Sequence, residues 1–236
     1  MDLKKLAGEQ AANMVESGMK VGLGTGSTAY WAVMRLGERM REGLDIVGVP
    51  TSEATKQLAI KLGIPLAELS TLEPLDLTID GADEINPDLN LIKGGGGALF
   101  REKMVAAASR KLIVVADESK VVERLGAFTV PVEVVPYGWE STAKRVAAAG
   151  CVPKLRLVKA AAGNADTGAG APGAESAFVT DNGNYILDCD FGLIEDPERL
   201  EAQINAILGV VETGLFIGMA ELAVIAAQSG VRTLTR

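Results

Sequence analysis

Between residues 20 and 117 the chain alternates short apolar stretches with segments of helical spacing, and this rhythm limits the folds that it can adopt. The stretches of strand character lie at 20–24, 45–50, 75–80 and 111–117. Helical patterns separate them, as at 27–43, where Ala29, Val33 and Leu36 recur on one face. Strands that alternate with helices favour a parallel sheet with helices on both faces. We therefore expect an α/β domain.

From about residue 129 the order of the elements changes to β-α-β-β-α-β, the ferredoxin-like pattern. The signals lie at 129–135, 139–150, 154–159, 184–190, 196–209 and 210–217. We expect a smaller α+β subdomain at 129–207, and a larger domain formed by 1–128 plus 208–236. The segment 160–176 is rich in Ala, Gly and Pro without periodicity, so we expect it to be a flexible loop.

The composition indicates a globular chain and disfavours nucleic-acid binding. Its 236 residues are 48% hydrophobic, which suffices for one large domain or a domain with a small appendage. The net charge of −8 disfavours a broad nucleic-acid surface. No apolar run is long enough to span a bilayer, and the two cysteines form no motif. We expect a cytoplasmic protein with free thiols and no contact with nucleic acid or membrane.

The chain contains no histidine. This excludes serine–histidine and cysteine–histidine nucleophile systems and most zinc sites. Proton transfer must therefore use carboxylates, lysine, tyrosine, cysteine or water.

The first candidate site is the stretch GLGTGSTA at 22–29, between a strand and a helix. Free N–H groups at a helix start attract an anion, and Thr25, Ser27 and Thr28 add hydroxyl donors. The stretch also fits a relaxed dinucleotide pattern, but the second strand lacks the terminal acidic residue that would hold a ribose. A single phosphate fits better than a dinucleotide, and a capped turn without a ligand stays open as the alternative.

The second candidate site is DGADE at 80–84, at the carboxyl end of the strand 75–80. Open α/β sheets bind ligands at that edge. Asp80 and Asp83 suit hydrogen bonds from sugar hydroxyls or proton transfer, while an Asx-type turn explains them equally well. A metal site would need further ligands, and the spacing offers none.

The third candidate site is the stretch IKGGGGALFREK at 92–103. Glycines before a helix expose several N–H groups to one point, with Lys93 before them and Glu102 in the first or second helical turn. For Glu102 alone, a solvated carboxylate favoured by the helix dipole is the commoner explanation.

The fourth candidate is Lys120, in ADESK at the end of the strand 111–117, which either reaches a phosphate or is a surface lysine. Four strand ends of one sheet thus carry polar or glycine-rich residues, which favours a shared site.

These motifs resemble those of ribose-5-phosphate isomerase, type A, in the same order and over nearly the whole chain. They are GLGTGSTA, DGADEIN, KGGGGAL with REK, ADESK, PVEVVP and VTDNGNYILD. The resemblance implies a Rossmann-like domain with a ferredoxin-like subdomain, assembled as a homodimer or a dimer of dimers. It implies reversible conversion of D-ribose 5-phosphate to D-ribulose 5-phosphate in the pentose phosphate pathway, with no metal or organic cofactor.

The resemblance also implies roles for single residues. The catalytic base matches Glu102, a further substrate lysine matches Lys120, and Lys4 matches an amino-terminal lysine that can reach the phosphate. The family's substrate-binding segments fall on Thr25, Gly26, Ser27, Thr28, Asp80, Gly81, Ala82, Asp83, Lys93, Gly94, Gly95 and Gly96. The long segment 160–176 and the stretch after Lys120 depart from the family pattern without touching a motif residue.

The implied chemistry moves a proton between C1 and C2 of the sugar through an enediolate. We expect Glu102 to act as the base, with a pKa that apolar packing or the aspartates raise and the helix dipole lowers. Lys93 and the glycine-loop N–H groups would stabilise the enediolate, and Asp80 and Asp83 would bind hydroxyls or assist ring opening. The hydroxyls at 25–28 and Lys120 would hold the phosphate.

Two other classes of protein are possible. A non-catalytic sugar-phosphate sensor of the transcription-regulator kind should carry a helix-turn-helix segment, and about twenty residues before the first strand are too few for one. A coenzyme A transferase uses a glutamate as a covalent nucleophile. The phosphate-type glycine loop and DGADE argue against that second class.

Overall fold

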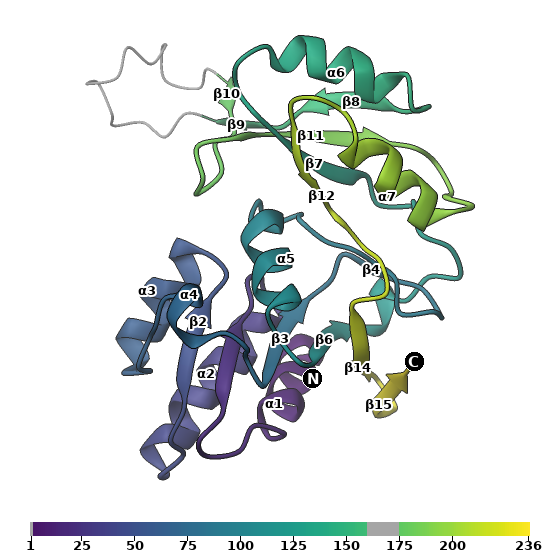
Figure 1. The fold of residues 1–236 in the computed structure, drawn as a ribbon. Coiled ribbons are helices and arrows are strands. Elements are labelled where there is room, and N and C mark those ends of the chain that lie inside the picture. Colours follow the sequence, from purple (N-terminus) through teal and green to yellow (C-terminus); the bar gives the residue numbers. More distant parts are fainter. Residues whose placement is uncertain (1, 160–174) are drawn as a thin grey trace.

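In this computed structural model, which describes residues 2–159 and 175–236, a six-stranded sheet forms the centre of the larger part (Figure 1). Its order is β15-β14-β6-β3-β1-β2. The strands are β1 (Lys20–Leu23), β2 (Val47–Pro50), β3 (Leu77–Gly81), β6 (Leu112–Asp117), β14 (Ala220–Ala227) and β15 (Gly230–Thr235). All neighbours pair in parallel except β14 and β15. The parallel sheet predicted from the alternating pattern is confirmed.

The helices of this part lie on both faces of the sheet. They are α1 (Leu3–Ala12), α2 (Ala29–Arg41), α3 (Glu53–Leu62), α4 (Leu69–Leu72), α5 (Leu99–Ala107) and the 3-10 helix η1 (Glu118–Lys120). The side chain of Asp2 caps α1, and that of Ser52 caps α3 by accepting a hydrogen bond from the N–H of Thr55. Helix α5 lies between the six-stranded sheet and the second part of the molecule (Figure 1).

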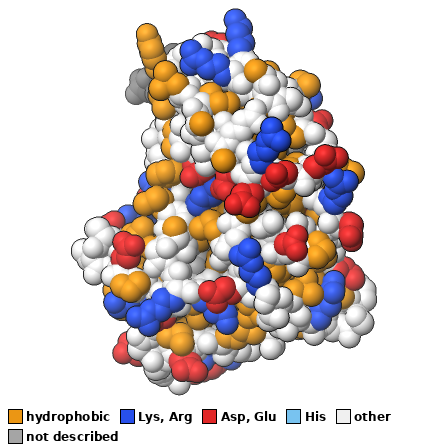
Figure 2. Space-filling model, turned by 45° about the vertical axis from the view of Figure 1, so that its right-hand side comes forward, with side chains coloured by type: hydrophobic (Ala, Val, Ile, Leu, Met, Phe, Trp, Pro, Cys, Tyr) orange, Lys and Arg blue, Asp and Glu red, His pale blue; other side chains and the backbone are white. Residues whose placement is uncertain are grey.

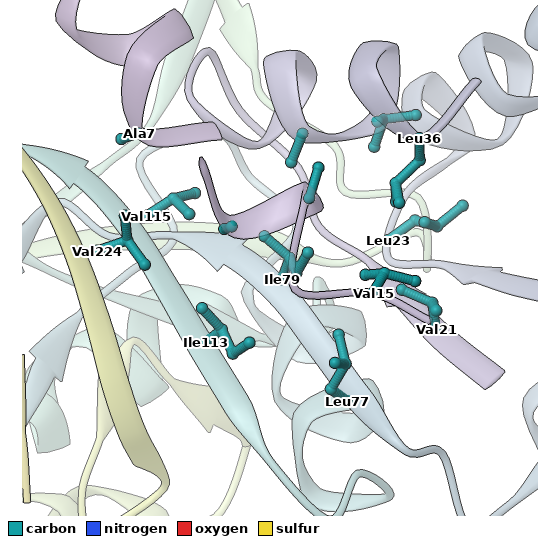
Figure 3. Close-up of a cluster of buried hydrophobic side chains, with 14 of the residues drawn as sticks. Ala7, Val15, Val21, Leu23, Leu36, Leu77, Ile79, Ile113, Val115 and Val224 are labelled. Carbon is teal, nitrogen blue, oxygen red and sulfur yellow. The ribbon is translucent and has the colours of Figure 1, made fainter. Parts of the chain in front are cut away.

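A buried apolar core joins α1 and α2 to the six-stranded sheet (Figure 3). Leu23, Ile79 and Val115 from the strands meet Ala7 and Leu36 from the helices, each at most 2% exposed. Burying one large aliphatic side chain is worth about 1.5–3 kcal/mol, so this core anchors the strands whose ends carry the candidate site.

The second part is built on a four-stranded sheet in the order β12-β7-β11-β8. Its strands are β7 (Val130–Val134), β8 (Val152–Leu155), β11 (Tyr185–Asp190) and β12 (Val210–Thr213), and its helices are α6 (Trp139–Ala147) and α7 (Pro197–Asn205). All neighbours are antiparallel, which gives the strand order of the ferredoxin-like pattern. Val146 of α6 and Ile204 of α7 are both buried in its core.

Two segments that were each predicted as one strand are divided in the structure, and those predictions are wrong. Residues 154–159 contribute to β8 and to β9 (Leu157–Lys159), which pairs with β10 (Glu175–Ala177). Residues 210–217 form β12 and then β13 (Leu215–Phe216). Between the latter two, the N–H of Gly214 donates to Pro131 and its carbonyl accepts from Lys93, so the chain passes from one sheet to another. The alternation of apolar and polar residues along a strand does not reveal such a transfer between sheets.

A third, three-stranded sheet joins β13 to β5 (Leu91–Ile92) and β4 (Glu84–Ile85). A domain division at 207 would separate β12 from the sheet in which it pairs with β7. We propose instead that the subdomain runs from 129 to 213. The expected loop at 160–176 lies outside the described residues up to 174, and residues 175 and 176 belong to β10.

No helix in the described part of the chain is long and apolar enough to cross a membrane. The face drawn in Figure 2 carries basic, acidic and apolar side chains interspersed, without a field of one sign.

Candidate active site

The ends of β1, β3 and β6 meet the glycine run 94–97 at one cavity of about 110 Å³. Its walls are Lys4, Thr25, Gly26, Ser27, Thr28, Gly81, Ala82, Asp83, Lys93, Gly94, Gly96, Glu102 and Lys120. Every one of them is a residue that the sequence singled out, and of the candidates only Asp80 and Gly95 do not line the cavity. The expectation of four strand ends in one sheet is wrong, because β5, which precedes the glycines, belongs to the three-stranded sheet.

A buried cluster of three charged side chains lies at the base of this cavity. The Lys93 ammonium is 3.1 Å from Oδ2 of Asp80 and 3.4 Å from Oε2 of Glu102, and it donates a hydrogen bond to the carbonyl of Gly81. The three side chains are 1–4% exposed. One cation therefore faces two carboxyl groups where water cannot screen them.

The cluster shifts the pKa of each member. Burial raises the pKa of Glu102 to about 8, with the Lys93 charge opposing and the Asp80 charge reinforcing the shift. Burial also raises the pKa of Asp80 against the pull of Lys93. Burial alone would lower the pKa of Lys93, but the carboxylates outweigh it and raise that pKa. Asp80 Oδ1 also accepts hydrogen bonds from the N–H groups of Thr25 and Gly81, and these bonds favour the ionised form of Asp80.

The glycine run turns tightly against Asp83 and Phe178. The N–H of Gly95 donates to Oδ2 of Asp83 at 2.8 Å, and a Cβ at residue 95 would lie only 2.7 Å from that carboxylate. At Gly97, φ is +83°, and a Cβ would lie 2.3 Å from the Phe178 ring. Larger residues at these two positions would displace the loop.

The walls of the cavity near Lys4 and the start of α2 are suited to an anion. Lys4 donates from Nζ to Oγ of Ser27 at 3.0 Å, and Thr28 stands at the start of α2. Lys120, the last residue of η1, also lines this space. Two ammonium groups, hydroxyls and a helix N-terminus together provide what a phosphate monoester requires.

The hydroxyl of Thr25 does not take part in that arrangement. It lies 2.7 Å from the hydroxyl of Thr51, 2.8 Å from that of Ser52 and 3.1 Å from that of Thr55. Thr25 therefore lines the cavity while its hydroxyl is engaged at the start of α3. The sequence assigned Thr25 the same task as Ser27 and Thr28, because spacing alone does not tell which way a hydroxyl points.

The structure adds neighbours of the site that no sequence pattern indicated. Arg156 donates to the carbonyls of Gly94 and Gly95, which lie 62 and 61 residues away along the chain. The Phe216 ring centroid lies 5.3 Å from the Lys93 ammonium. Contacts of this range leave no local signal in the sequence.

A larger cavity of about 670 Å³ lies between α3, α5 and the segment 64–69. Its walls are mostly apolar, and they include neither Glu102 nor the glycine run. Its volume does not make it the reactive site, because its charged residues, such as Glu53, Lys56 and Arg101, pair at the surface, and it has no buried carboxyl group beside a lysine. Among residues 2–159 and 175–236, no group of three or more Cys, Asp or Glu side chains is placed to hold a metal ion.

Comparison with known proteins gives a consistent result. Residues 47–230 match the family model for ribose 5-phosphate isomerase A, also called phosphoriboisomerase A. The chain is 53% identical over 235 residues to ribose-5-phosphate isomerase A of Nitrobacter hamburgensis, covering 99% of this chain and 97% of the relative. The solved ribose 5-phosphate isomerase A of Methanocaldococcus jannaschii superposes with a TM-score of 0.88 at 39% identity, covering 100% of this chain and 99% of that one.

A second solved D-ribose-5-phosphate isomerase, in complex with phospho-erythronic acid, has a TM-score of 0.89 at 39% identity and covers 100% of this chain and 98% of its own. The family model covers more than half of this chain, and the Nitrobacter hamburgensis relative matches the chain over almost its whole length. The chain belongs to the ribose 5-phosphate isomerase A family.

Proposed function

We propose that this protein interconverts D-ribose 5-phosphate and D-ribulose 5-phosphate, the reaction of its family. The observation that carries the proposal is the buried Glu102, which opens onto a small polar cavity beside Lys93. A general base works best when its pKa lies near the working pH, and the pKa of Glu102 is raised to about 8. An ordinary surface glutamate would be a much weaker base.

The proton transfer follows from the placement of these groups. In the open-chain aldose, the Glu102 carboxylate removes the proton from C2, and the C1 carbonyl oxygen becomes an enediolate oxygen. Glu102 then returns the proton to C1 while the hydroxyl proton of O2 passes to O1, which becomes the C1 hydroxyl of the ketose. The charge that develops on O1 and O2 is stabilised by the Lys93 ammonium and by N–H groups of the glycine run.

The phosphate is held by the walls of the cavity near Lys4 and the start of α2. Lys4, Ser27, Thr28 and Lys120 surround this space together with the first turn of α2. Anchoring the phosphate fixes the sugar relative to Glu102, and this positioning supplies part of the rate enhancement. Asp83 faces the cavity and is suited to accept hydrogen bonds from the sugar hydroxyls.

The resemblance supports further proposals about the setting of the reaction. We place it in the non-oxidative pentose phosphate pathway, in the cytoplasm, with a homodimer or a dimer of dimers as the assembly. The chemistry described above needs no metal ion or organic cofactor.

The direct test is to incubate the purified protein with ribose 5-phosphate and to measure ribulose 5-phosphate. We expect the ketose to form until an equilibrium mixture is reached, and the reverse reaction from ribulose 5-phosphate to reach the same mixture. A sugar-phosphate sensor would bind without turnover, and a coenzyme A transferase would require an acyl-coenzyme A. Absence of turnover in a folded, substrate-binding protein would overturn the proposal.

A further inference from the structure

Arg156 lies between β8 and β9, in the four-stranded part, yet its guanidinium reaches the glycine run. Its Nη1 donates to the carbonyl of Gly94 at 2.8 Å and to that of Gly95 at 3.3 Å. The other side of the guanidinium grips Asp188 of β11, with Nε to Oδ2 at 3.0 Å and Nη2 to Oδ1 at 2.5 Å. The Arg156 side chain is 15% exposed, so these bonds are largely shielded from water.

The direction of the two carbonyls has a consequence for the cavity. In a trans peptide the C=O and the N–H point to opposite sides, so holding the carbonyls of Gly94 and Gly95 directs the N–H groups of Gly95 and Gly96 the other way. The N–H of Gly95 does point away, to Asp83 at 2.8 Å. Gly96 lines the cavity, and its N–H has no acceptor within residues 2–159 and 175–236.

We propose that Arg156 is a positioning residue for the isomerisation, which holds the glycine run so that the N–H of Gly96 faces the developing enediolate. The proposal rests on the proposed function. A run of four glycines loses more backbone entropy on ordering than other sequences of its length, so the bonds from Arg156 add to the internal bond from the Gly97 N–H to the Gly94 carbonyl in fixing the run. Catalysis by such donors depends on their being in place before charge develops.

The forked shape of the guanidinium suits this task. One edge binds the Asp188 carboxylate bidentately, which fixes the plane of the group, and the remaining nitrogen spans two consecutive carbonyls. Lysine has no such plane and would satisfy these acceptors only in part. Phe178 supports the same loop, because its ring lies against Gly97 and 5.9 Å from the guanidinium carbon of Arg156. The ferredoxin-like part thus contributes to the site without lining it.

The test compares Arg156→Met, Arg156→Lys and Asp188→Asn with Arg145→Met, which replaces an exposed arginine on α6. We expect Arg156→Met to lower kcat by about 10- to 100-fold, the effect of misplacing a catalytic array by about 1 Å. The KM for ribose 5-phosphate should change by less than about threefold, because the contacts that bind the substrate equally in the ground state and in the transition state are retained. Arg156→Lys and Asp188→Asn should fall between Arg156→Met and the parent.

Two further measurements distinguish a positioning role of Arg156 from a general loosening of the active site. Phospho-erythronic acid, which a solved relative binds, carries a carboxylate suited to the donors that meet the enediolate. Arg156→Met should weaken inhibition by this acid by about the factor lost in kcat, while inhibition by inorganic phosphate stays unchanged. The pH midpoint of kcat/KM should also stay that of the parent, because no bond joins Arg156 to Glu102 among the described residues.

An unchanged kcat in Arg156→Met, relative to Arg145→Met, would overturn the inference. Equal weakening of phosphate and of phospho-erythronic acid would overturn it as well, since that result indicates a loosened site. If circular dichroism shows that Arg156→Met does not fold, Arg156→Lys and Asp188→Asn decide by the same criteria. An inactive parent protein would refute the proposed function itself, whereas an active parent with fully active Arg156 variants refutes only the positioning role.

Discussion

The ammonium of Lys93 lies 3.4 Å from the carboxyl group of Glu102, and both side chains are almost completely buried. The contact does not make Glu102 an ordinary ion-pair partner, because Lys93 is also 3.1 Å from Asp80. One positive charge shared between two carboxyl groups leaves Glu102 able to gain and release a proton near neutral pH. A base that must remove a proton from carbon and return it requires that property.

The pH dependence of the reaction follows from the raised pKa of Glu102. The base must be ionised in the free enzyme, so kcat/KM should rise about tenfold per pH unit below the pKa and level off above about pH 8. The measurement is a profile of kcat/KM from pH 5.5 to 9.5. A kcat/KM that is already constant from pH 5.5 upward would show that the base has an unshifted pKa.

The same shift predicts that Glu102 opposes folding at alkaline pH. Its pKa is raised on folding, so between the unfolded value of about 4.5 and the folded value of about 8 the native state holds more protons. The stability of the parent therefore falls across this range as pH rises, and the neutral Gln of Glu102→Gln removes that loss. The variant's advantage in free energy of unfolding should grow by about 1 kcal/mol per pH unit from pH 5 to 8.

Urea unfolding at several pH values measures this difference. Glu53→Gln is a suitable control, because Glu53 is exposed, pairs with Arg101 and does not belong to the buried cluster of Lys93, Asp80 and Glu102. An advantage of Glu102→Gln that stays constant with pH would contradict the assignment of the raised pKa to Glu102.

Thr25 and Ser27 should respond differently to loss of their hydroxyls. Thr25→Val removes hydrogen bonds to Thr51, Ser52 and Thr55, and each such bond contributes about 1 kcal/mol, so the protein should lose about 1–3 kcal/mol of stability with little change in KM. Ser27→Ala should instead raise KM and leave stability almost unchanged. Thermal unfolding and steady-state kinetics of both variants test this prediction. A raised KM in Thr25→Val at unchanged stability would show that the Thr25 hydroxyl contacts the phosphate.

Lys120→Ala should act mainly on substrate binding. Loss of one charged contact to a phosphate costs about 1.5–3 kcal/mol, which corresponds to a rise in KM of about tenfold or more. The exposed Lys61 at the end of α3 provides the matched control, Lys61→Ala. If KM is unchanged in Lys120→Ala, Lys120 does not contact the phosphate.

The sequence predicted the parallel sheet and the cavity well, for a physical reason. Strand and helix periods are local properties, and parallel strands bring their carboxyl ends to one edge whatever their order. The wall residues that follow these strands, 25–28, 81–83 and Lys120, therefore came together as expected, whereas Lys4 was expected only from the family resemblance. The glycine run reached the same cavity by another route, after a short strand of a separate sheet.

The features that the sequence did not reveal depend on side-chain direction and on distant partners. Whether Thr25 points to a ligand or to Ser52 is decided by packing at the start of α3. Arg156 carries no pattern that joins it to Gly94, and the transfer of the chain at Gly214 between two sheets interrupts a segment that has the pattern of one strand. Such relationships come from tertiary structure and not from periodicity.

The most direct test of the account is the turnover of Glu102→Gln with ribose 5-phosphate, measured together with the Kd for the substrate. If Glu102 is the base, kcat should fall by about 1,000-fold or more while the Kd changes by less than about threefold, because the amide keeps the shape of the side chain but cannot accept the proton. A kcat within about tenfold of the parent in the folded, substrate-binding variant would contradict the central claim.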